Sequence, residues 1–474
     1  MVWLISAFVL LSSAALAQPT IQTLFGGPPD GLPALTASLN LPAAVIADPR
    51  GGGVIAGLRN GHQIVRIGTD GKVTSVAGTG VNASSGDGGP ARLAAIESPG
   101  GFAFDQAGNL YFSDSAANVI RRIGTDGIIS AFAGNGKAAY AGDKGQAVQA
   151  SLKQPTQIVF DASGNLLIAD TGNHAIRLVA PNGIITTFAG VGNQAAGGDG
   201  GLANQAGLYS PFGVAIDSTG VVYIADTGSQ RIRTVTSDGI INIFAGRGVP
   251  GYGGDGGDPL RANFYNPTTL AFDASGQLYI NDQTNYRIRR IQTDGRILSF
   301  AGTGTKGAEG DGGIAKSANI SPVALALDAR NNLLIADGDN NRVRIVTAAD
   351  GVIDTLAGNG TSSYDPRNLF RNGDSLYFSD VSAQRIKVFN LSTGAISVVA
   401  GSGNGGFLGD GASAFDAYLR NPRGLAVDSA GNLYFADSGN HRIRKVDASS
   451  NISTIAGNGT ASSTGDEDWL RRQP

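Results

Sequence analysis

The sequence repeats one stretch many times, and this periodicity limits the fold more than any other feature. The last copy, residues 421–459, reads NPRGLAVDSAGNLYFADSGNHRIRKVDASSNISTIAGNG. It contains four short alternating apolar runs, separated by SAGN, SGN and ASSN, which have the composition of turns. Four such runs predict an antiparallel four-stranded meander, the sheet that a β-propeller repeats around its axis.

Eight copies align by the end of their second apolar run, which usually reads like YxAD. These ends lie at Gly57, Asp114, Asp170, Asp226, Asp282, Asp337, Asp380 and Asp437, with spacings of 57, 56, 56, 56, 55, 43 and 57 residues. A Gly-rich linker such as SGDGGPARLAAIESP, residues 85–99, joins successive copies. No linker follows Gly360, which explains the spacing of 43.

We therefore predict an all-β chain that forms a single β-propeller of four-stranded antiparallel blades, with eight units in residues 18–459. The alternative is seven blades plus a displaced unit. The units lie near residues 42–80, 99–136, 155–192, 211–248, 267–304, 322–360, 367–403 and 422–459, and residues 460–474 form an irregular tail. The 71 glycines lie mostly between the runs, so they indicate many tight turns.

The N-terminal residues resemble the end of a unit without its beginning. Residues 20–42 contain a fourth-strand run and a linker, but no first three runs precede them. A propeller can close its ring by letting one terminus complete a blade begun by the other, and residues 21–25 are the predicted seam strand. Because residues 452–456 are also a fourth strand, one of the two is surplus for eight blades.

Residues 1–17 read MVWLISAFVLLSSAALA, an apolar segment that ends in the small-residue pattern Ala15-Leu16-Ala17. This pattern predicts a signal peptide, cleaved before Gln18, and a secreted or periplasmic protein with no membrane insertion after cleavage. The segment carries no Lys or Arg. A transmembrane anchor is the alternative, although the run is short for a full span.

Composition excludes several classes of function. The sequence has no cysteine, so a disulfide framework or a thiolate metal site cannot form. The net charge is −3 and no basic run occurs, so nothing favours nucleic acid as a partner.

Acidic and basic residues recur at a spacing of seven. The pairs are Asp114/Arg121, Asp170/Arg177, Asp226/Arg233, Asp282/Arg289, Asp337/Arg344, Asp380/Lys387 and Asp437/Arg444. The first unit has Gly57 and Val65 instead, so it lacks both partners. A hairpin between the two positions would bring them together, and a guanidinium can hold a carboxylate with two hydrogen bonds. We interpret the pairs as structural.

The runs NHRIRKV, LYFADSGN and GLAVDSAGN resemble NHL repeats, and the likeness recurs over most of residues 21–459. The GDGG linkers resemble those of secreted bacterial NHL proteins. The resemblance implies a propeller that serves as a scaffold for binding proteins, RNA or other ligands. Relatives with chemistry include a zinc-dependent peptidyl-hydroxyglycine lyase and calcium-dependent lactonases.

The residues that could bind a metal are three histidines and the aspartates of the GDGG-like loops. His62, His174 and His441 occupy one repeat position, so a ring would spread them apart, whereas zinc needs three or four ligands around one point. Calcium is the alternative cofactor, with Asp87, Asp199, Asp255 and Asp311 of the GDGG-like loops as candidate ligands. The other interpretation is that each Asp only opens a turn.

Three aromatic residues depart from the repeat. Tyr140, Tyr252 and Phe407 each stand three residues before a loop Asp, where other units have Ser84, Ala196 or Ala308. Exposed aromatic side chains are favoured at binding surfaces, so these three are the candidate ligand-binding residues. Packing against the neighbouring linker is the alternative.

The sequence thus predicts a monomeric, non-catalytic binding scaffold for protein or carbohydrate ligands. No residue is predicted to be catalytic. The alternative is a metal-dependent lactonase- or lyase-like enzyme with a site in the axial channel, which would require unlike residues from several blades to converge there.

Overall fold

The computed structural model describes residues 31–360, 366–372, 374–381, 383–390, 396–428 and 430–460. They form eight sheets, each with a core of four antiparallel strands joined in sequence order. The repeat count and the four-stranded antiparallel meander are therefore confirmed. The predicted seam strand, residues 21–25, the signal peptide and most of the C-terminal tail lie outside the described residues.

The eight sheets fall into two compact units, divided between residues 363 and 364. The six-sheet unit begins with sheet 1, formed by β2 (Pro42–Ala47), β3 (Val54–Leu58), β4 (Gln63–Ile67) and β5 (Lys72–Ala77). Sheet 2 contains β6 (Pro99–Phe104), β7 (Leu110–Asp114), β8 (Val119–Ile123) and β9 (Ile129–Ala133). Sheet 3 contains β10 (Pro155–Phe160), β11 (Leu166–Asp170), β12 (Ala175–Val179) and β13 (Ile185–Ala189).

Sheet 4 contains β14 (Gly213–Ile216), β15 (Val222–Asp226), β16 (Arg231–Val235) and β17 (Ile241–Ala245). Sheet 5 contains β18 (Pro267–Phe272), β19 (Leu278–Asp282), β20 (Arg287–Ile291) and β21 (Ile297–Ala301). Sheet 6 contains β23 (Pro322–Leu327), β24 (Leu333–Asp337), β25 (Arg342–Val346) and β26 (Val352–Ala357).

The two-sheet unit contains the last two repeats. Sheet 7 is formed by β27 (Pro366–Asn372), β28 (Ser375–Asp380), β29 (Arg385–Asn390) and β30 (Ile396–Ala400). Sheet 8 is formed by β31 (Pro422–Val427), β32 (Leu433–Asp437), β33 (Arg442–Val446) and β34 (Ile452–Ala456). Two short strands, β1 (Leu32–Pro33) and β22 (Gly313–Ile314), belong to linkers and pair with β5 and β26.

The linkers are short and carry single turns of 3₁₀ helix. These are η1 (Ala91–Leu93), η2 (Ala147–Gln149), η4 (Ala203–Gln205), η6 (Pro259–Arg261), η8 (Ala315–Ser317) and η10 (Ala414–Asp416). Similar turns join the second and third strands: η3 (Thr171–Asn173), η5 (Thr227–Ser229), η7 (Gln283–Asn285), η9 (Gly338–Asn340) and η11 (Ser438–Asn440).

Local sequence explains the hairpins. The Asp161 carboxylate accepts hydrogen bonds from the backbone N–H groups of Ser163 and Asn165 at 2.9 and 2.8 Å, as expected for an Asp that opens a tight turn. Gly190 ends the outer strand of sheet 3 with a φ of +95°, and a Cβ there would lie 2.5 Å from the His174 carbonyl oxygen. Only glycine fits this position without strain.

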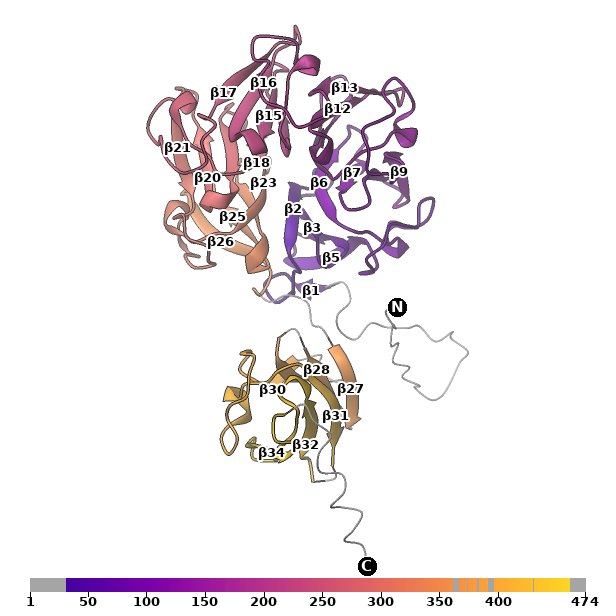
Figure 1. Cartoon of the computed structure of the whole chain (residues 1–474), viewed down its shortest axis with the longest axis vertical. Helices are drawn as coiled ribbons and strands as arrows, with labels where there is room; N and C mark the ends of the chain where they lie inside the picture. The colour runs from indigo at the N-terminus through magenta and orange to yellow at the C-terminus, as the bar shows by residue number, and fades with distance from the viewer. Residues whose placement is uncertain are drawn as a thin grey trace, which may run out of the picture. The chain divides into compact units, whose positions relative to one another are not determined.

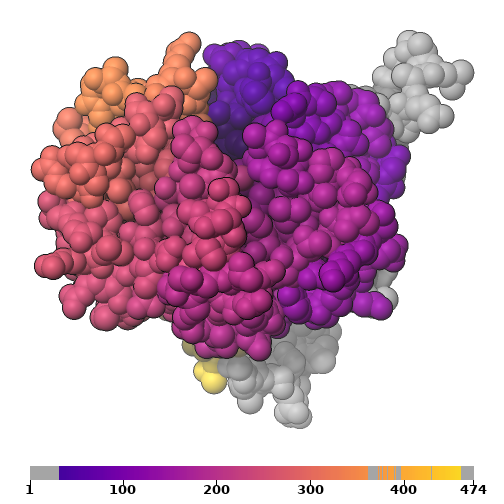
Figure 2. Space-filling view, turned by 90° about the horizontal axis from the view of Figure 1, so that it is seen from above, coloured from indigo at the N-terminus to yellow at the C-terminus, as the bar shows by residue number. Residues whose placement is uncertain are grey.

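The six-sheet unit is a ring. Its innermost strands contact their neighbours in the order β2, β6, β10, β14, β18 and β23, and β23 also contacts β2. Figure 1 shows the six sheets around a central axis, with outer strands such as β9, β13 and β17 at the periphery. In Figure 2 the orange residues of sheet 6 lie beside the indigo residues of sheet 1.

The structure differs from the single eight-membered ring that the repeat count suggested, because sheet 1 already packs against sheet 6. One hydrophobic cluster joins β2 and β3 of sheet 1, β24 and β25 of sheet 6, and the N-terminal linker that precedes sheet 1. The Asn341 side-chain oxygen of sheet 6 accepts a hydrogen bond of 3.0 Å from the Leu41 N–H of that linker. The ring of this unit therefore contains six sheets, and sheets 7 and 8 belong to the other compact unit.

The N-terminal linker substitutes for the linker that the chain lacks after Gly360. In other sheets the glycine after the outer strand donates to the following linker, as Gly190 does to Ala203 at 2.9 Å. In sheet 6 the equivalent Gly358 N–H donates to the Ala34 carbonyl at 2.8 Å. Two features of the sequence, a missing linker and a surplus one, are thus parts of one ring closure.

We predict that Leu39→Ala destabilises the six-sheet unit as strongly as Leu208→Ala, by about 2–5 kcal/mol each. Both side chains are fully buried at the same place in a linker, Leu39 in the closing linker and Leu208 in the linker between sheets 3 and 4. Urea unfolding followed by circular dichroism measures both variants. If Leu39→Ala left the free energy of unfolding unchanged while Leu208→Ala lowered it, the N-terminal linker would not close the ring.

Candidate functional site

The recurring arginines lie buried between two carboxylates, of which the sequence pairs included only one. Arg177 lies 3.3 Å from Asp170 of its own sheet and 2.6 Å from Asp143 of the preceding linker. The guanidinium also donates to the linker carbonyl of Ser151 at 3.3 Å. Each arginine therefore fastens a linker to the sheet that follows it.

The same arrangement recurs in six sheets. The distances to the strand Asp are 3.8 Å for Arg121–Asp114, 3.7 Å for Arg233–Asp226, 3.4 Å for Arg289–Asp282, 3.7 Å for Arg344–Asp337 and 3.5 Å for Arg444–Asp437. Those to the linker Asp are 2.9 Å for Asp87, 2.8 Å for Asp199, 2.6 Å for Asp255, 2.5 Å for Asp311 and 2.7 Å for Asp410. The linker carboxylate is the nearer partner throughout.

The two sheets that depart from the pattern support this role. Sheet 7 has no linker of the GDGG type before it in the sequence, and its Lys387 lies 2.7 Å from the strand residue Asp380. In sheet 1 the strand register places Leu58, and not Gly57, at the Asp position, where it pairs with Gln63, and places Val65 at the Arg position, where it pairs with Ala56. The side chains of Leu58 and Val65 are both buried, so an apolar pair replaces the charged one there.

Burial changes the protonation of the strand carboxylates. Removal from water raises the pKa of Asp114 to about 6, although hydrogen bonds from the Ser98 and Glu97 N–H groups and the charge of Arg121 oppose this. Burial likewise raises the pKa values of Asp170, Asp226, Asp282 and Asp337 to about 6.

The candidate calcium ligands all belong to these networks. Asp87, Asp199, Asp255 and Asp311 each face a different arginine, and each lies in a different linker. A guanidinium at hydrogen-bonding distance repels a second cation, and a calcium ion needs six to eight oxygen ligands around one point. Among the described residues no group of three or more His, Asp or Glu side chains could hold a metal. The geometry thus gives these carboxylates a structural role.

The three aromatic candidates cover the same arginines. Tyr140 lies over Arg177, Tyr252 over Arg289 and Phe407 over Arg444, with ring centroids 5.1, 5.1 and 5.0 Å from the guanidinium carbon. The Tyr252 hydroxyl also donates to Asp255 at 2.8 Å. The structure therefore does not bring them together at one site. Each closes its own network while remaining 39%, 47% and 41% exposed, respectively.

The repeat position of the three histidines has a positive φ and lies next to the following linker. The His174 ring Nδ1 accepts a hydrogen bond of 2.9 Å from the Ser210 N–H, and Gln230 accepts one of 2.7 Å from the Asn266 N–H. Asn118, Asn341 and Gln384 accept equivalent bonds. Asn and Gln accept a hydrogen bond here, as His174 does, whereas His62 donates from Nδ1 to the Glu97 carbonyl oxygen at 2.6 Å, so the position ties its sheet to the following linker.

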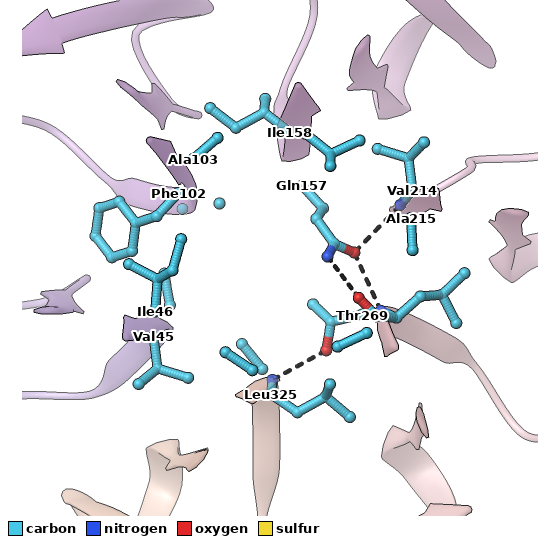
Figure 3. Close-up of a pocket in the computed structure, with 18 of the residues that line it drawn as sticks. Val45, Ile46, Phe102, Ala103, Gln157, Ile158, Val214, Ala215, Thr269 and Leu325 are labelled. Carbon is cyan, nitrogen blue, oxygen red and sulfur yellow. Dashed lines mark hydrogen bonds between the residues drawn. The ribbon is translucent and has the colours of Figure 1, made fainter. Parts of the chain in front are cut away.

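A pocket of about 490 Å³ follows the axis of the six-sheet ring, lined by residues of all six innermost strands. Figure 3 shows Val45, Ile46, Phe102 and Val214 around it. The lining contains no carboxylate and no histidine, and its one charged residue is Arg59. This chemistry suits an apolar group better than a reaction that needs acids, bases or a metal.

Gln157 is the main polar side chain that crosses the pocket. From β10 it donates to the Leu270 carbonyl of β18 at 2.9 Å, and its oxygen accepts from the N–H groups of Leu270 and Val214 at 3.1 and 3.2 Å (Figure 3). The equivalent positions hold Ala44, Gly101, Gly213, Thr269 and Ala324, which are smaller. Gln157 therefore ties three sheets together at one level of the axis.

Arg59 directly follows β3. Because Leu58 at the end of β3 pairs with Pro42 at the start of β2, Arg59 lies at the end of the pocket where the innermost strands begin. Its position holds Ser115, Thr171 and Thr227 in the next sheets, whose hydroxyls donate to the Pro carbonyl of the following sheet at 2.5, 2.8 and 2.6 Å. Burial lowers the pKa of Arg59. Among the described residues its guanidinium has no hydrogen-bond or ion-pair partner.

Sequence reasoning missed both Arg59 and Gln157. Each departs from the small or hydroxyl-bearing residues at its repeat position, and this is the signal that an alignment of the eight units could have used. Arg59 and Gln157 face the same pocket because the ring closes after six sheets.

Comparison with known proteins agrees with the repeat pattern. A model of the teneurin NHL domain matches residues 190–249 and 370–466. The bovine (Bos taurus) NHL repeat-containing protein 2 is 29% identical over 346 residues, which cover 62% of this chain and 46% of that protein. Human teneurin-4 is 29% identical over 291 residues, 53% of this chain and 10% of the teneurin. The chain thus spans less than half the length of these relatives.

The fold also matches a solved structure, a Bacteroides thetaiotaomicron protein of unknown function, with a TM-score of 0.50. That match has 16% sequence identity and covers 67% of this chain and 72% of the other. The chain is thus similar to NHL-repeat proteins over these segments, and its fold is similar to that of a solved structure.

We predict that Arg233→Met destabilises the six-sheet unit by about 3–5 kcal/mol, because it leaves Asp226 buried without a counter-charge and releases the preceding linker. Arg231→Met in the same strand is the control, since this side chain is only half-buried. Its effect should stay below about 1 kcal/mol. Denaturant unfolding measures both, and equal losses would contradict the linker-fastening role.

The raised pKa of Asp114 predicts a pH dependence. Because the folded pKa of about 6 lies above the ordinary value of 3.8 for an Asp side chain, the folded chain binds the proton more tightly than the unfolded chain does. The stability that this group contributes is present below about pH 4 and is lost as the pH rises through 6. The difference in unfolding free energy between the wild type and Asp114→Asn should therefore fall between pH 4.5 and 7.5. A difference for Asp114→Asn that stays constant over this pH range would contradict the prediction.

Proposed function

We propose that this chain is a non-catalytic binding module, and that the axial pocket of the six-sheet ring receives an apolar group whose anionic end meets Arg59. The observation that carries the proposal is the pocket lining, in which one unpaired guanidinium stands among apolar side chains. The Arg59 side chain is partly buried and has no ion-pair partner among the described residues, so a ligand carboxylate would stabilise its charge.

A protein or peptide ligand fits this pocket better than a carbohydrate. A sugar needs many hydrogen-bond partners, whereas the lining offers mainly Gln157, which is already engaged, and a few hydroxyls. Tyr140, Tyr252 and Phe407, which could stack on a sugar, already cover arginines. We therefore favour a peptide with an apolar side chain and a nearby carboxylate.

The enzyme alternative finds no support in the same pocket. A metal-dependent lactonase or lyase would need acidic or amide side chains from several sheets to converge on the axis. The amide present, Gln157, is bound to backbone groups, and the lining has no carboxylate. No catalytic residue is therefore proposed.

We also propose that the protein is secreted or periplasmic and monomeric. The first part rests on residues 1–17, which have the pattern of a signal peptide. Among the described residues, no helix combines the length and the hydropathy that crossing a bilayer requires.

The ligand proposal is tested with two probes that differ only in charge, octanoate and octanol, by calorimetric titration of the full chain. Octanoate should bind more tightly than octanol, and Arg59→Met should weaken octanoate roughly tenfold or more while leaving octanol unchanged. Arg261→Met, on an exposed linker, is the matched control.

A second variant fills the pocket with a side chain that other sheets already carry at the same repeat position. Ala47 occupies the repeat position of Phe104, Phe160 and Phe272, so Ala47→Phe should fold and should abolish binding of both probes. The proposal would be contradicted if the Ala47→Phe variant still bound the probes, or if Arg59→Met left the affinity for octanoate unchanged.

A further inference from the structure

A second cavity lies at the outer edge of sheet 3 and shares no residue with the axial pocket. It is an open cleft of about 530 Å³ between the linker before sheet 3, the outer strand β13 and the linker that follows the sheet. Tyr140 and Lys144 belong to the first linker. Thr186 belongs to β13, and Asn204 belongs to η4 of the second linker. Six of the eight lining residues carry polar side chains, so the cleft suits a polar ligand.

Lys144 holds a backbone conformation that a side chain disfavours. Its φ is +67°, and its N–H donates to the Ile185 carbonyl of β13 at 2.7 Å. The other described linkers have glycine at this position, with φ from +77° to +85° and the equivalent hydrogen bond. These glycines are Gly31, Gly88, Gly200, Gly256, Gly312 and Gly411. Residues with a Cβ are strained in this conformation, and such strain concentrates at ligand sites, so Lys144 is a candidate ligand contact.

Sheet 3 also lacks an arginine that other sheets place over this region. In sheet 5 the Arg287 guanidinium donates to the carbonyls of the two residues that follow β21, at 3.1 Å to the first of them. The equivalent residue in sheet 3 is Ala175, since each of the two pairs with the last Asp of its second strand. The two residues that follow β13, Gly190 and Val191, therefore have no arginine over them, and they line the cleft.

The acidic side chain of the cleft is already balanced. Asp143 lies 2.6 Å from Arg177 and accepts a hydrogen bond of 2.7 Å from the Thr187 hydroxyl. Because the Thr187 proton is used there, the Tyr140 hydroxyl donates to Thr187 at 2.6 Å and keeps its own oxygen as an acceptor. One face of the Tyr140 ring covers Arg177, so its hydroxyl, and not that face, is offered to a ligand.

Three further polar side chains of the cleft have no hydrogen-bond or ion-pair partner among the described residues. They are the Lys144 ammonium, the Thr186 hydroxyl and the Asn204 amide. Lys144 is the one cation among the eight lining residues, and Asp143 is neutralised by Arg177, so the cleft attracts an anion. An ammonium beside amide and hydroxyl groups matches a ligand that carries one carboxylate and several hydroxyls.

We propose that this cleft binds an acidic sugar whose carboxylate pairs with Lys144. The sugar hydroxyls exchange hydrogen bonds with Asn204, Thr186 and the Tyr140 oxygen, and Val191 contacts the apolar side of the sugar ring. An acidic peptide fits less well, because Val191 is the one aliphatic side chain that the lining offers to neighbouring peptide residues. The site is separate from the axial pocket and does not depend on the ligand proposed there.

The test is saturation-transfer NMR of the full chain with sugars that differ in charge. Methyl glucuronide and methyl galacturonide carry a carboxylate, whereas methyl glucoside has a similar ring without one. We expect at least one uronide to bind saturably and at least tenfold more tightly than the glucoside, because the glucoside cannot pair with Lys144.

Lys144→Gly gives this linker the residue that the other linkers already carry. It should not lower the melting temperature, because it relieves the backbone strain, and it should weaken uronide binding at least tenfold. Asn204→Leu, which introduces the residue found at Leu260 in the next linker, should also fold and weaken the uronide. Lys316→Ala removes an exposed lysine from the linker before sheet 6, and this matched control should bind as the wild type.

The proposal is overturned if neither uronide binds, if the glucoside binds equally well, or if Lys144→Gly leaves the uronide affinity unchanged. Tighter binding of N-acetylglutamate N-methylamide than of both uronides would also overturn it, in favour of an acidic peptide. Arg59→Met should leave uronide binding unchanged. If that variant abolished it instead, the uronide would occupy the axial pocket, and the site in this cleft would be refuted while the axial site would stand.

Discussion

The structure depends on how each linker is fastened between two sheets. A buried arginine holds the linker through its Asp and its carbonyl groups, while two small residues and one apolar residue fill the space between the sheets. The glycine after the preceding outer strand donates to the same linker. Since strands of neighbouring sheets do not share backbone ladders, these contacts and the apolar clusters carry the cohesion of the ring.

This linker contact also decides where the ring closes. Residues 32–41 are covalently joined to sheet 1 but are docked on sheet 6, so they act as the linker that the chain omits after residue 360. Closure leaves no sheet of that unit with an uncovered face.

The axial pocket follows from closure. Six innermost strands surround a space lined by short and apolar side chains, and only two residues depart from the repeat within it. Gln157 links three sheets, so it has a structural explanation, whereas the Arg59 guanidinium has no partner within the part of the chain that the structure describes. A charge in a largely apolar pocket favours a ligand with the opposite charge, and this is the basis of the proposed binding role.

The repeat pattern by itself determined the four-stranded sheets, their number and their turns, because alternation, glycine and Asp act locally. It also identified the Asp–Arg spacing, since residues seven apart meet across one hairpin. It could not determine that the linker Asp is the nearer partner of Arg177, or that Tyr140 covers it, because residues 143 and 140 belong to a different segment. Only the tertiary structure decided that sheet 1 meets sheet 6 and that Arg59 faces the axis. Ring size depends on the angle between packed sheets, and that angle is set by side-chain volumes across contacts far apart in sequence.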